Sequence, residues 1–159
     1  MGKVLVAFFS VNGVTERVAG KLAAAAAADL YEIVPEVPYT QEDLDWENKE
    51  SRTTVEMADR NCRPSIGPAL PDMTEYDTVY VGFPLWWYRE PSIIDTFMEN
   101  ADLAGKTVVP FCTSGADDLG DSADNMQALA PDAKVLPGKR FKAGVTANEL
   151  RQWVNGLAE

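Results

Sequence analysis

The sequence predicts a single α/β domain, built on a parallel sheet with helices on both faces. Short apolar runs alternate with helix-like segments five times along the chain, which is the pattern of repeated βαβ units. The first run, KVLVAFF at residues 3–9, is almost continuously apolar, as expected for a strand buried on both faces. The chain has 159 residues, enough for one hydrophobic core, so we treat 1–159 as one domain.

The first helix and the second strand follow the first strand directly. In residues 14–30, Val14, Val18 and Leu22 recur at helical spacing, and a run of alanines supplies the residue with the highest helix propensity. Residues 30–34 are predicted to form the second strand. Pro35 and Pro38 end it, because proline cannot donate a hydrogen bond to a central ladder.

Residues 40–59 are polar and acidic and are predicted to form a surface excursion of helical turns. Thr40 and Asp43 have the spacing of an N-cap residue and its N3 partner in a short helix. The run EDLDWENKE at 42–50 could suggest paired catalytic carboxylates. We interpret it as a solvated face, because the spacing implies neither a partner acid nor a substrate pocket.

Three further strands alternate with three helices in the second half. The strands are expected at 77–83, at 107–114 and within the run KVLPGKRF at 134–141. Residues 90–101 are predicted to form a helix with Pro91 near its first turn, and 121–130 another. The last helix, at 146–158, opens with a capping box made by Thr146 and Glu149.

Composition excludes several kinds of chemistry. The chain has no histidine, which removes Ser-His-Asp triads, Cys-His dyads and histidine-ligated zinc. Cys62 and Cys112 are fifty positions apart and form neither a CxxC pair nor a four-thiolate metal site. We therefore expect no metal centre, and two reduced thiols of a cytoplasmic protein.

Charge and hydropathy limit the classes of binding partner that we expect for this protein. The net charge of −11 would repel nucleic acid and would suit docking onto a basic protein partner. The sequence has no apolar run near the roughly 20 residues of a membrane helix, and no recognisable targeting signal. We expect neither nucleic acid nor a membrane as a partner.

The strand ends point to three loops, because ligands of parallel α/β sheets bind at the carboxyl ends of the strands. The loop at 10–15, SVNGVT, runs from a buried strand into a helix N-terminus, where free backbone N–H groups favour an anion such as phosphate. An ordinary capped turn is the alternative. The loop lacks both the GxGxxG pattern and the GxxxxGK[ST] pattern, so the usual dinucleotide and nucleoside triphosphate sites are not indicated.

The other two loops suggest a flat ligand. The loop at 84–90 follows the third strand and contains Trp86, Trp87 and Tyr88. Aromatic side chains at such a position can stack on a heteroaromatic ring. Alternatively, one tryptophan belongs to the core and the others cap a helix. The loop at 113–121 has two glycines and three acids, and it suits a ring edge contacted by backbone groups.

In combination, SVNGVTE after the first strand, GFPLWWY after the third and PFCTSG after the fourth resemble the flavodoxin family, and within it the short bacterial flavodoxin-like branch. The resemblance spans essentially the whole chain. It implies a five-stranded parallel sheet in the order 2-1-3-4-5 and non-covalent FMN at the strand ends. By this resemblance the phosphate is held by Ser10, Asn12, Gly13 and Thr15 with the backbone of Val11 and Val14. The isoalloxazine ring is flanked by Pro84, Leu85, Trp86, Trp87 and Tyr88 on one side and by Thr113, Ser114 and Gly115 on the other.

The resemblance implies an FMN-dependent redox protein in which no side chain need act as an acid or base. A carrier of single electrons that docks on a basic face of a protein partner is one hypothesis. An NAD(P)H-dependent reductase of quinones or nitro compounds is another. A third is an interaction module without FMN, because Asn12 stands where the family commonly has threonine and Val14 is apolar. The acids of the third loop, without Lys or Arg in the three loops, are expected to lower the flavin potential.

Overall fold

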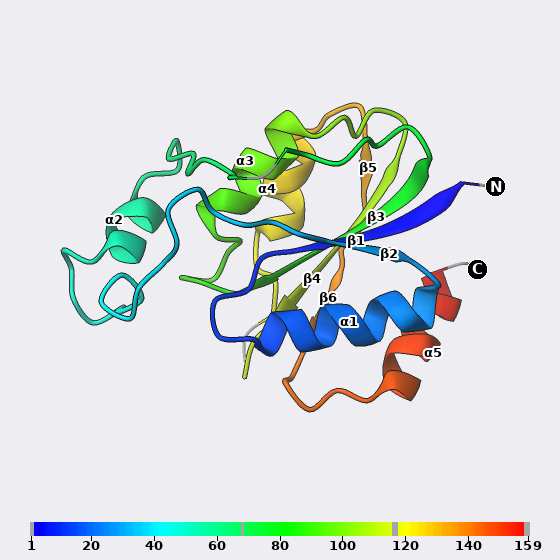
Figure 1. Ribbon diagram of the computed structural model, residues 1–159, viewed down its shortest axis with the longest axis horizontal. Coiled ribbons are helices and arrows are strands. Elements are labelled where there is room, and N and C mark those ends of the chain that lie inside the picture. The colour runs from blue at the N-terminus through cyan, green and yellow to red at the C-terminus, as the bar shows by residue number, and fades with distance from the viewer. Residues whose placement is uncertain (1, 68, 116–117, 158–159) are drawn as a thin grey trace.

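The computed structural model describes residues 2–67, 69–115 and 118–157. Its centre is a parallel sheet in the order β2-β1-β3-β4-β5, with a short sixth strand that also pairs with β4 (Figure 1). This confirms the predicted fold class and strand order. The strands are β1 (Lys3–Phe8), β2 (Asp29–Glu32), β3 (Tyr76–Pro84), β4 (Thr107–Thr113), β5 (Lys134–Val135) and β6 (Lys139–Phe141).

The helices cover both faces of the sheet. Helices α1 (Val14–Ala26) and α5 (Ala147–Leu157) lie together on one face, and α3 (Ser92–Asn100) and α4 (Ser122–Leu129) lie on the other (Figure 1). The remaining helix, α2 (Arg52–Ala58), lies in the excursion that extends away from the sheet. None of the described helices combines the length and apolarity that crossing a membrane requires.

The core has two layers, and the sheet separates them. Leu5 and Ala7 of β1 face the cluster under α3 and α4, whereas Val6 and Phe8 face the cluster under α1 and α5. Successive strand residues point to opposite faces, so burial of both faces accounts for the continuous apolar run that begins the sequence.

The fifth strand differs from the prediction, because it is broken into β5 and β6. Leu136 N–H donates to Val108 O at 2.9 Å, and Ser114 N–H donates to Phe141 O at 3.1 Å. Pro110 lies between these two bonds on the same side of β4 and has no N–H to donate. The chain passes this gap at Gly138, where a Cβ would lie 2.2 Å from Pro110 O. The missing donor therefore interrupts the strand.

The excursion also departs in part from the prediction. Thr40 and Asp43 form the reciprocal bonds expected of a capping pair, from Thr40 N–H to Asp43 Oδ2 at 2.9 Å and from Asp43 N–H to Thr40 Oγ1 at 3.1 Å. They enclose only turns, and the helix forms later, at α2. Thr53 N–H and Oγ1 both donate to Asp43 O, which fastens the turns onto the start of α2.

The end of α1 provides a test of backbone strain. Ala27 closes the helix in the left-handed conformation, with φ 52° and ψ 47°. This conformation costs an L-residue about 1–2 kcal/mol and glycine little, so Ala27→Gly is expected to raise the free energy of unfolding by about 1 kcal/mol. Ala24→Gly, at an exposed position inside the same helix, is expected to lower it by about the same amount. Urea unfolding measures the free energy of unfolding of both variants. An equal loss of this free energy in the two variants would contradict the prediction.

Candidate functional site

The predicted loops meet at the carboxyl edge of the sheet, where the structure has a pocket of about 590 Å³. Seven of the predicted site residues line it: Val11, Asn12, Leu85, Trp86, Trp87, Tyr88 and Ser114. The other seven do not line the pocket: Ser10, Gly13 and Gly115 lie in the loops, Val14 and Thr15 in the first turn of α1, and Pro84 and Thr113 at the ends of β3 and β4.

The first loop forms a tight bend into α1. Gly13 has φ 87°, a left-handed conformation that favours glycine. Ser10 Oγ accepts from Gly13 N–H and Asn12 Oδ1 accepts from Val14 N–H, each at 3.2 Å. These two bonds shape the loop and occupy the N–H groups of Gly13 and Val14. The loop lies at the N-terminus of a 13-residue helix, where the helix dipole and the remaining N–H groups of the first turn favour an anion.

A buried hydroxyl pair joins the first loop to the third. Thr15 and Thr113 are both buried, and their Oγ1 atoms are 2.7 Å apart. The hydroxyl of Thr15, which is predicted to help hold a phosphate, lies against that of Thr113, and either of the two can be the donor. Because this bond spans two strand ends, it fixes the spacing between the phosphate loop and the loop after β4.

The aromatic loop is a strained two-residue turn. Trp86 and Arg89 exchange both backbone hydrogen bonds at 3.1 Å, with Trp87 at φ 47° and Tyr88 at φ 63° between them. Two-residue turns with positive φ normally contain glycine or asparagine. Strain of this kind, of order 1–3 kcal/mol per residue, is typical of functional sites. Here it exposes two large aromatic side chains beside the pocket.

Only one of the three aromatic residues belongs to the packed interior, as the alternative interpretation proposed. Trp86 packs edge-on against Phe9 at 5.5 Å and against Tyr39 at 5.6 Å between ring centres. Trp87 and Tyr88 remain 41% and 70% exposed, and both line the pocket. They do not cap a helix, so that part of the alternative is wrong.

The third loop packs against the second. Leu85 N–H donates to Thr113 O at 3.2 Å, and a Cβ on Gly120 would lie 2.5 Å from Tyr88 O. Gly115 is exposed, and Ser114 contributes to the pocket wall. Ala116 and Asp117, two of the residues in this predicted loop, lie outside the described part of the chain.

Sequence reasoning missed one wall of the pocket. The excursion between β2 and β3 was interpreted as a solvated face, yet it supplies four residues of the lining: Gln41, Leu44, Trp46 and Thr53. Trp46 is 70% exposed there. The available signal was the presence of a leucine and a tryptophan inside an otherwise acidic run.

Tyr39 anchors this wall to the domain. Its ring contacts Phe9 and Trp86, the Arg52 guanidinium lies 3.8 Å from the ring centre, and its hydroxyl donates to Glu56 Oε1 at 2.6 Å. Burial and the neighbouring Glu56 carboxylate raise the pKa of Tyr39. The tyrosine therefore stays neutral and keeps its hydrogen bond.

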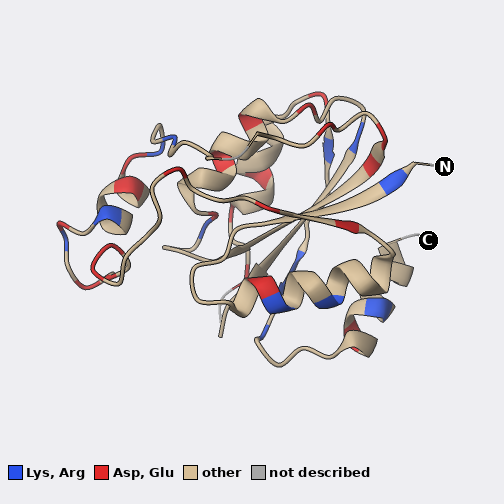
Figure 2. Cartoon of the chain, viewed as in Figure 1, with Lys and Arg blue, Asp and Glu red and all other residues tan. Residues whose placement is uncertain are grey.

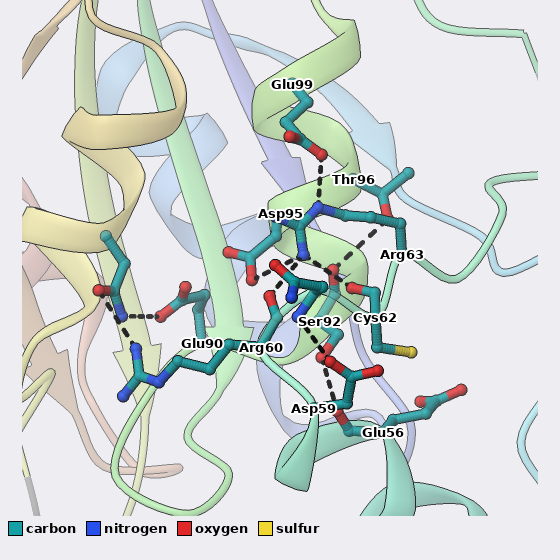
Figure 3. A network of polar contacts seen from close by, with 12 residues as sticks. Glu56, Asp59, Arg60, Cys62, Arg63, Glu90, Ser92, Asp95, Thr96 and Glu99 are labelled. Carbon is teal, nitrogen blue, oxygen red and sulfur yellow. Dashed lines mark hydrogen bonds and ion pairs between the residues drawn. The ribbon is translucent and has the colours of Figure 1, made fainter.

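A buried charge network supports the aromatic turn from below. The Arg89 guanidinium is buried, donates to Met57 O at 2.9 Å and lies 3.7 Å from Asp95 Oδ2. Arg63 lies between Asp95 and Glu99 and pairs with both (Figure 3). One end of the aromatic loop is thus bound to both α2 and α3.

One acid of this network keeps its proton at neutral pH. The side chains of Glu90 and Asp95 lie together, and the described residues offer no donor to Glu90 Oε2 or Asp95 Oδ1. Burial, followed by the hydrogen bond and charge of Glu90, raises the pKa of Asp95 well above its usual range. The Asp95 carboxyl is therefore protonated at neutral pH and can donate to Glu90.

Two arginines reach the loops from outside them. An Nη1 of Arg17 lies 3.3 Å from the position of a Cβ on Gly13, and Arg140 of β6 donates to Ser114 O at 3.3 Å. The expectation of a lowered flavin potential assumed that these loops contain no Lys or Arg, and it overlooked Arg89 at the end of the aromatic loop. These two side chains place positive charge beside the first and third loops and remove that premise.

A family model described as flavodoxin matches residues 3–157. The chain belongs to the flavodoxin family. It is 43% identical to a protein of Bacteroides uniformis ATCC 8492 that is provisionally described as a flavoprotein, over 97% of this chain and 98% of that one, with a TM-score of 0.92. A similarly described protein of Bacteroides eggerthii DSM 20697 is 44% identical, over 100% of this chain and 99% of that one, with a TM-score of 0.93.

A more distant structure has the same fold. A flavoprotein of Lactobacillus acidophilus NCFM, solved in complex with FMN, is 20% identical over 96% of this flavodoxin and 99% of that chain, with a TM-score of 0.71. Among curated protein sequences, none matches.

The residues present fit the cofactor that the family implies. FMN needs an anion site and a slot for a planar ring, and its phosphate is the group that a glycine-containing helix N-terminus accommodates. Gly13 leaves the space above the first loop free of a Cβ, with the Arg17 guanidinium beside it. The slot beside the loop has tryptophan side chains on two walls and a volume within the range of small-molecule sites.

Proposed function

We propose that this flavodoxin binds FMN non-covalently in the pocket of about 590 Å³, which we call the flavin pocket, and transfers electrons through it. The observation that carries the proposal is the meeting of a phosphate-type loop with an aromatic-walled slot at one edge of the sheet. Family membership and the FMN found in the Lactobacillus acidophilus flavoprotein support it. Bound FMN supplies the capacity to accept and release one or two electrons.

The chain supplies binding, orientation and a defined environment. The first loop and Arg17 would hold the phosphate, because they combine backbone donors with a positive charge. Trp87 and Tyr88 would shield the ring from water on one side. Their strained turn would have little freedom to move, because Arg89 fixes its end to Met57 O.

A single-electron carrier is the function we favour within this proposal. The wall that borders the pocket belongs to an acidic excursion, with Glu42, Asp43, Asp45, Glu47 and Glu50 close together in the sequence (Figure 2). Negative charge beside a redox centre would guide a basic protein surface toward it. The unpaired Cys62 and Cys112 agree with a reducing compartment such as the cytoplasm.

The exposed aromatic residues at the pocket favour a second candidate, an NAD(P)H-dependent reductase of quinones or nitro compounds. Trp46, Trp87 and Tyr88 are all exposed there and could receive a planar substrate. Anaerobic mixing of the FMN-loaded protein with NADPH separates the two. A carrier remains oxidised until a separate donor protein is added, whereas rapid reduction by NADPH alone followed by quinone turnover establishes the reductase.

Trp46 is expected to contribute directly to FMN affinity. An aromatic contact adds about 0.5–1.5 kcal/mol, so Trp46→Ala should weaken FMN binding by up to about tenfold while leaving unfolding unchanged, because the side chain is 70% exposed. Val55→Ala, at an exposed position of α2 away from the pocket, is the matched control. Fluorescence titration measures both. Unchanged affinity in Trp46→Ala would remove the excursion from the site.

A further inference from the structure

A second pocket lies between β6 and α5. It has a volume of about 790 Å³, against about 590 Å³ for the flavin pocket, and it is formed by β6, the turn that follows β6, and α5. The two pockets are neighbours, because Arg140 lines the second one and donates to Ser114 O in the wall of the first. The family likeness assigns nothing to this second pocket.

Its rim is basic, in a protein that is otherwise strongly acidic. Lys139, Arg140 and Lys142 all line the pocket. The segments 14–26 and 139–157, which include α1 and α5, carry six basic and two acidic residues, whereas the rest of the chain carries eight basic and 23 acidic. Figure 2 shows the blue segments of α1, β6 and α5 on one side of the molecule. The Lys21 ammonium adds to this side by donating to Val145 O at 3.0 Å.

The floor of the pocket is apolar and rigid. The half-buried Trp153 packs at 5.0 Å from Phe141 and at 5.6 Å from Tyr80 between ring centres, so the indole is held in place while one part of it lines the pocket. Val145 completes the apolar surface. Gly144 and Gly156 also line the pocket, and a Cβ on either would meet no described atom within 4 Å.

The lining also includes hydrogen-bond acceptors. Glu149 and Gln152 of α5 supply carboxylate and amide oxygens. The pocket therefore combines three kinds of lining group: the cations of β6 and the residue after it, aromatic rings, and carboxylate and amide oxygens. A ligand that satisfies all three has an anionic group, a flat ring, and hydroxyl or amino donors.

We propose that this second pocket binds a mononucleotide-like ligand, with its phosphate on Lys139, Arg140 and Lys142 and its base on Trp153. Lysine and arginine are the usual partners of phosphate, and an indole face is a good platform for a flat ring. The volume lies within the range of small-molecule sites, about 300–1,000 Å³. This site does not depend on FMN binding in the flavin pocket.

Adenosine 5′-monophosphate and the tryptophan side chains test this directly. The chain has four tryptophans, of which Trp46, Trp86 and Trp87 line the flavin pocket and Trp153 lines the second pocket. In a ¹⁵N NMR titration the indole signal of Trp153, assigned from Trp153→Phe, is expected to shift with saturation. The indole signals of the other three tryptophans should not shift. Adenosine, which lacks the phosphate, should bind at least tenfold more weakly than AMP.

Charge variants complete the test. Lys139→Gln with Lys142→Gln removes two exposed rim charges and is expected to weaken AMP binding at least tenfold. The control variant, Lys3→Gln with Lys49→Gln, changes the net charge by the same amount at exposed positions outside the pocket. It should leave the affinity for AMP unchanged. No shift of Trp153 at millimolar AMP overturns the proposal, as does equal binding of adenosine. A shift of Trp153 with a glutamate peptide but not with AMP also overturns it, in favour of an acidic protein segment.

Discussion

Gly13→Ala is expected to weaken FMN binding by about tenfold or more. The residue has φ 87°, where a Cβ costs about 1–2 kcal/mol, and the new methyl group would lie 3.3 Å from Arg17 Nη1. Relief of the strain would change the direction of the N–H groups at the start of α1, and the added volume would occupy space beside the phosphate. Because each 1.4 kcal/mol corresponds to tenfold in affinity, either effect alone approaches the expected loss.

Gly20→Ala is the matched control for Gly13→Ala. Gly20 is exposed in the same helix, and outside that helix no described atom lies within 4 Å of a Cβ placed there. Alanine inside a helix is favoured over glycine by about 1 kcal/mol, so this variant should unfold at higher urea and bind FMN unchanged. Equal FMN affinities in the two variants would show that the first loop does not hold the phosphate.

Asp95→Asn is expected to stabilise the protein at mildly alkaline pH and to flatten its pH dependence. Burial and the hydrogen-bonded Glu90 raise the pKa of Asp95 to about 9, from 3.8 for an exposed side chain. Between these values the folded protein keeps a proton that the unfolded chain releases, so the free energy of unfolding falls as pH rises, by at most about 1.4 kcal/mol per pH unit. An asparagine amide can donate to Glu90 without a titrating proton, and it removes this contribution.

The experiment compares urea unfolding at several pH values between 5 and 9. Asp102→Asn serves as the control, because it removes an exposed acid just beyond the same helix, α3. That variant should keep the pH slope of the parent protein. A parallel pH profile in Asp95→Asn, or a loss of stability at pH 8, would mean that Asp95 does not keep a proton in the folded protein.

The sequence was sufficient for the strand order and for the three loops, because each rests on local patterns and on a resemblance that spans the chain. It was not sufficient for the contacts between distant segments. Pro110 was visible in the fourth strand, but its effect depends on which strand lies beside it, so the break between β5 and β6 was missed. The site wall at Trp46 likewise depends on how the excursion folds back.

The electrostatics of the site were also beyond local reasoning. Arg17 and Arg140 lie outside the predicted loops and reach them only in the folded protein. Glu90 and Asp95 are five residues apart in the sequence. The raised pKa of Asp95 arises from burial and from the neighbouring Glu90 side chain, and it persists although Arg63 and Arg89 act to lower it. Such shifts follow from packing, which composition and spacing do not determine.

A parallel titration of the apo protein with FMN and with riboflavin tests the central proposal most directly, with flavin fluorescence as the signal. Riboflavin has the same ring system and lacks the phosphate. Hydrogen bonds to a charged group contribute about 1.5–3 kcal/mol each, so two such bonds predict that FMN binds at least about a hundredfold more tightly. Equal affinities would contradict the assigned phosphate loop. No saturable change with either flavin would leave the interaction module without FMN as the remaining hypothesis.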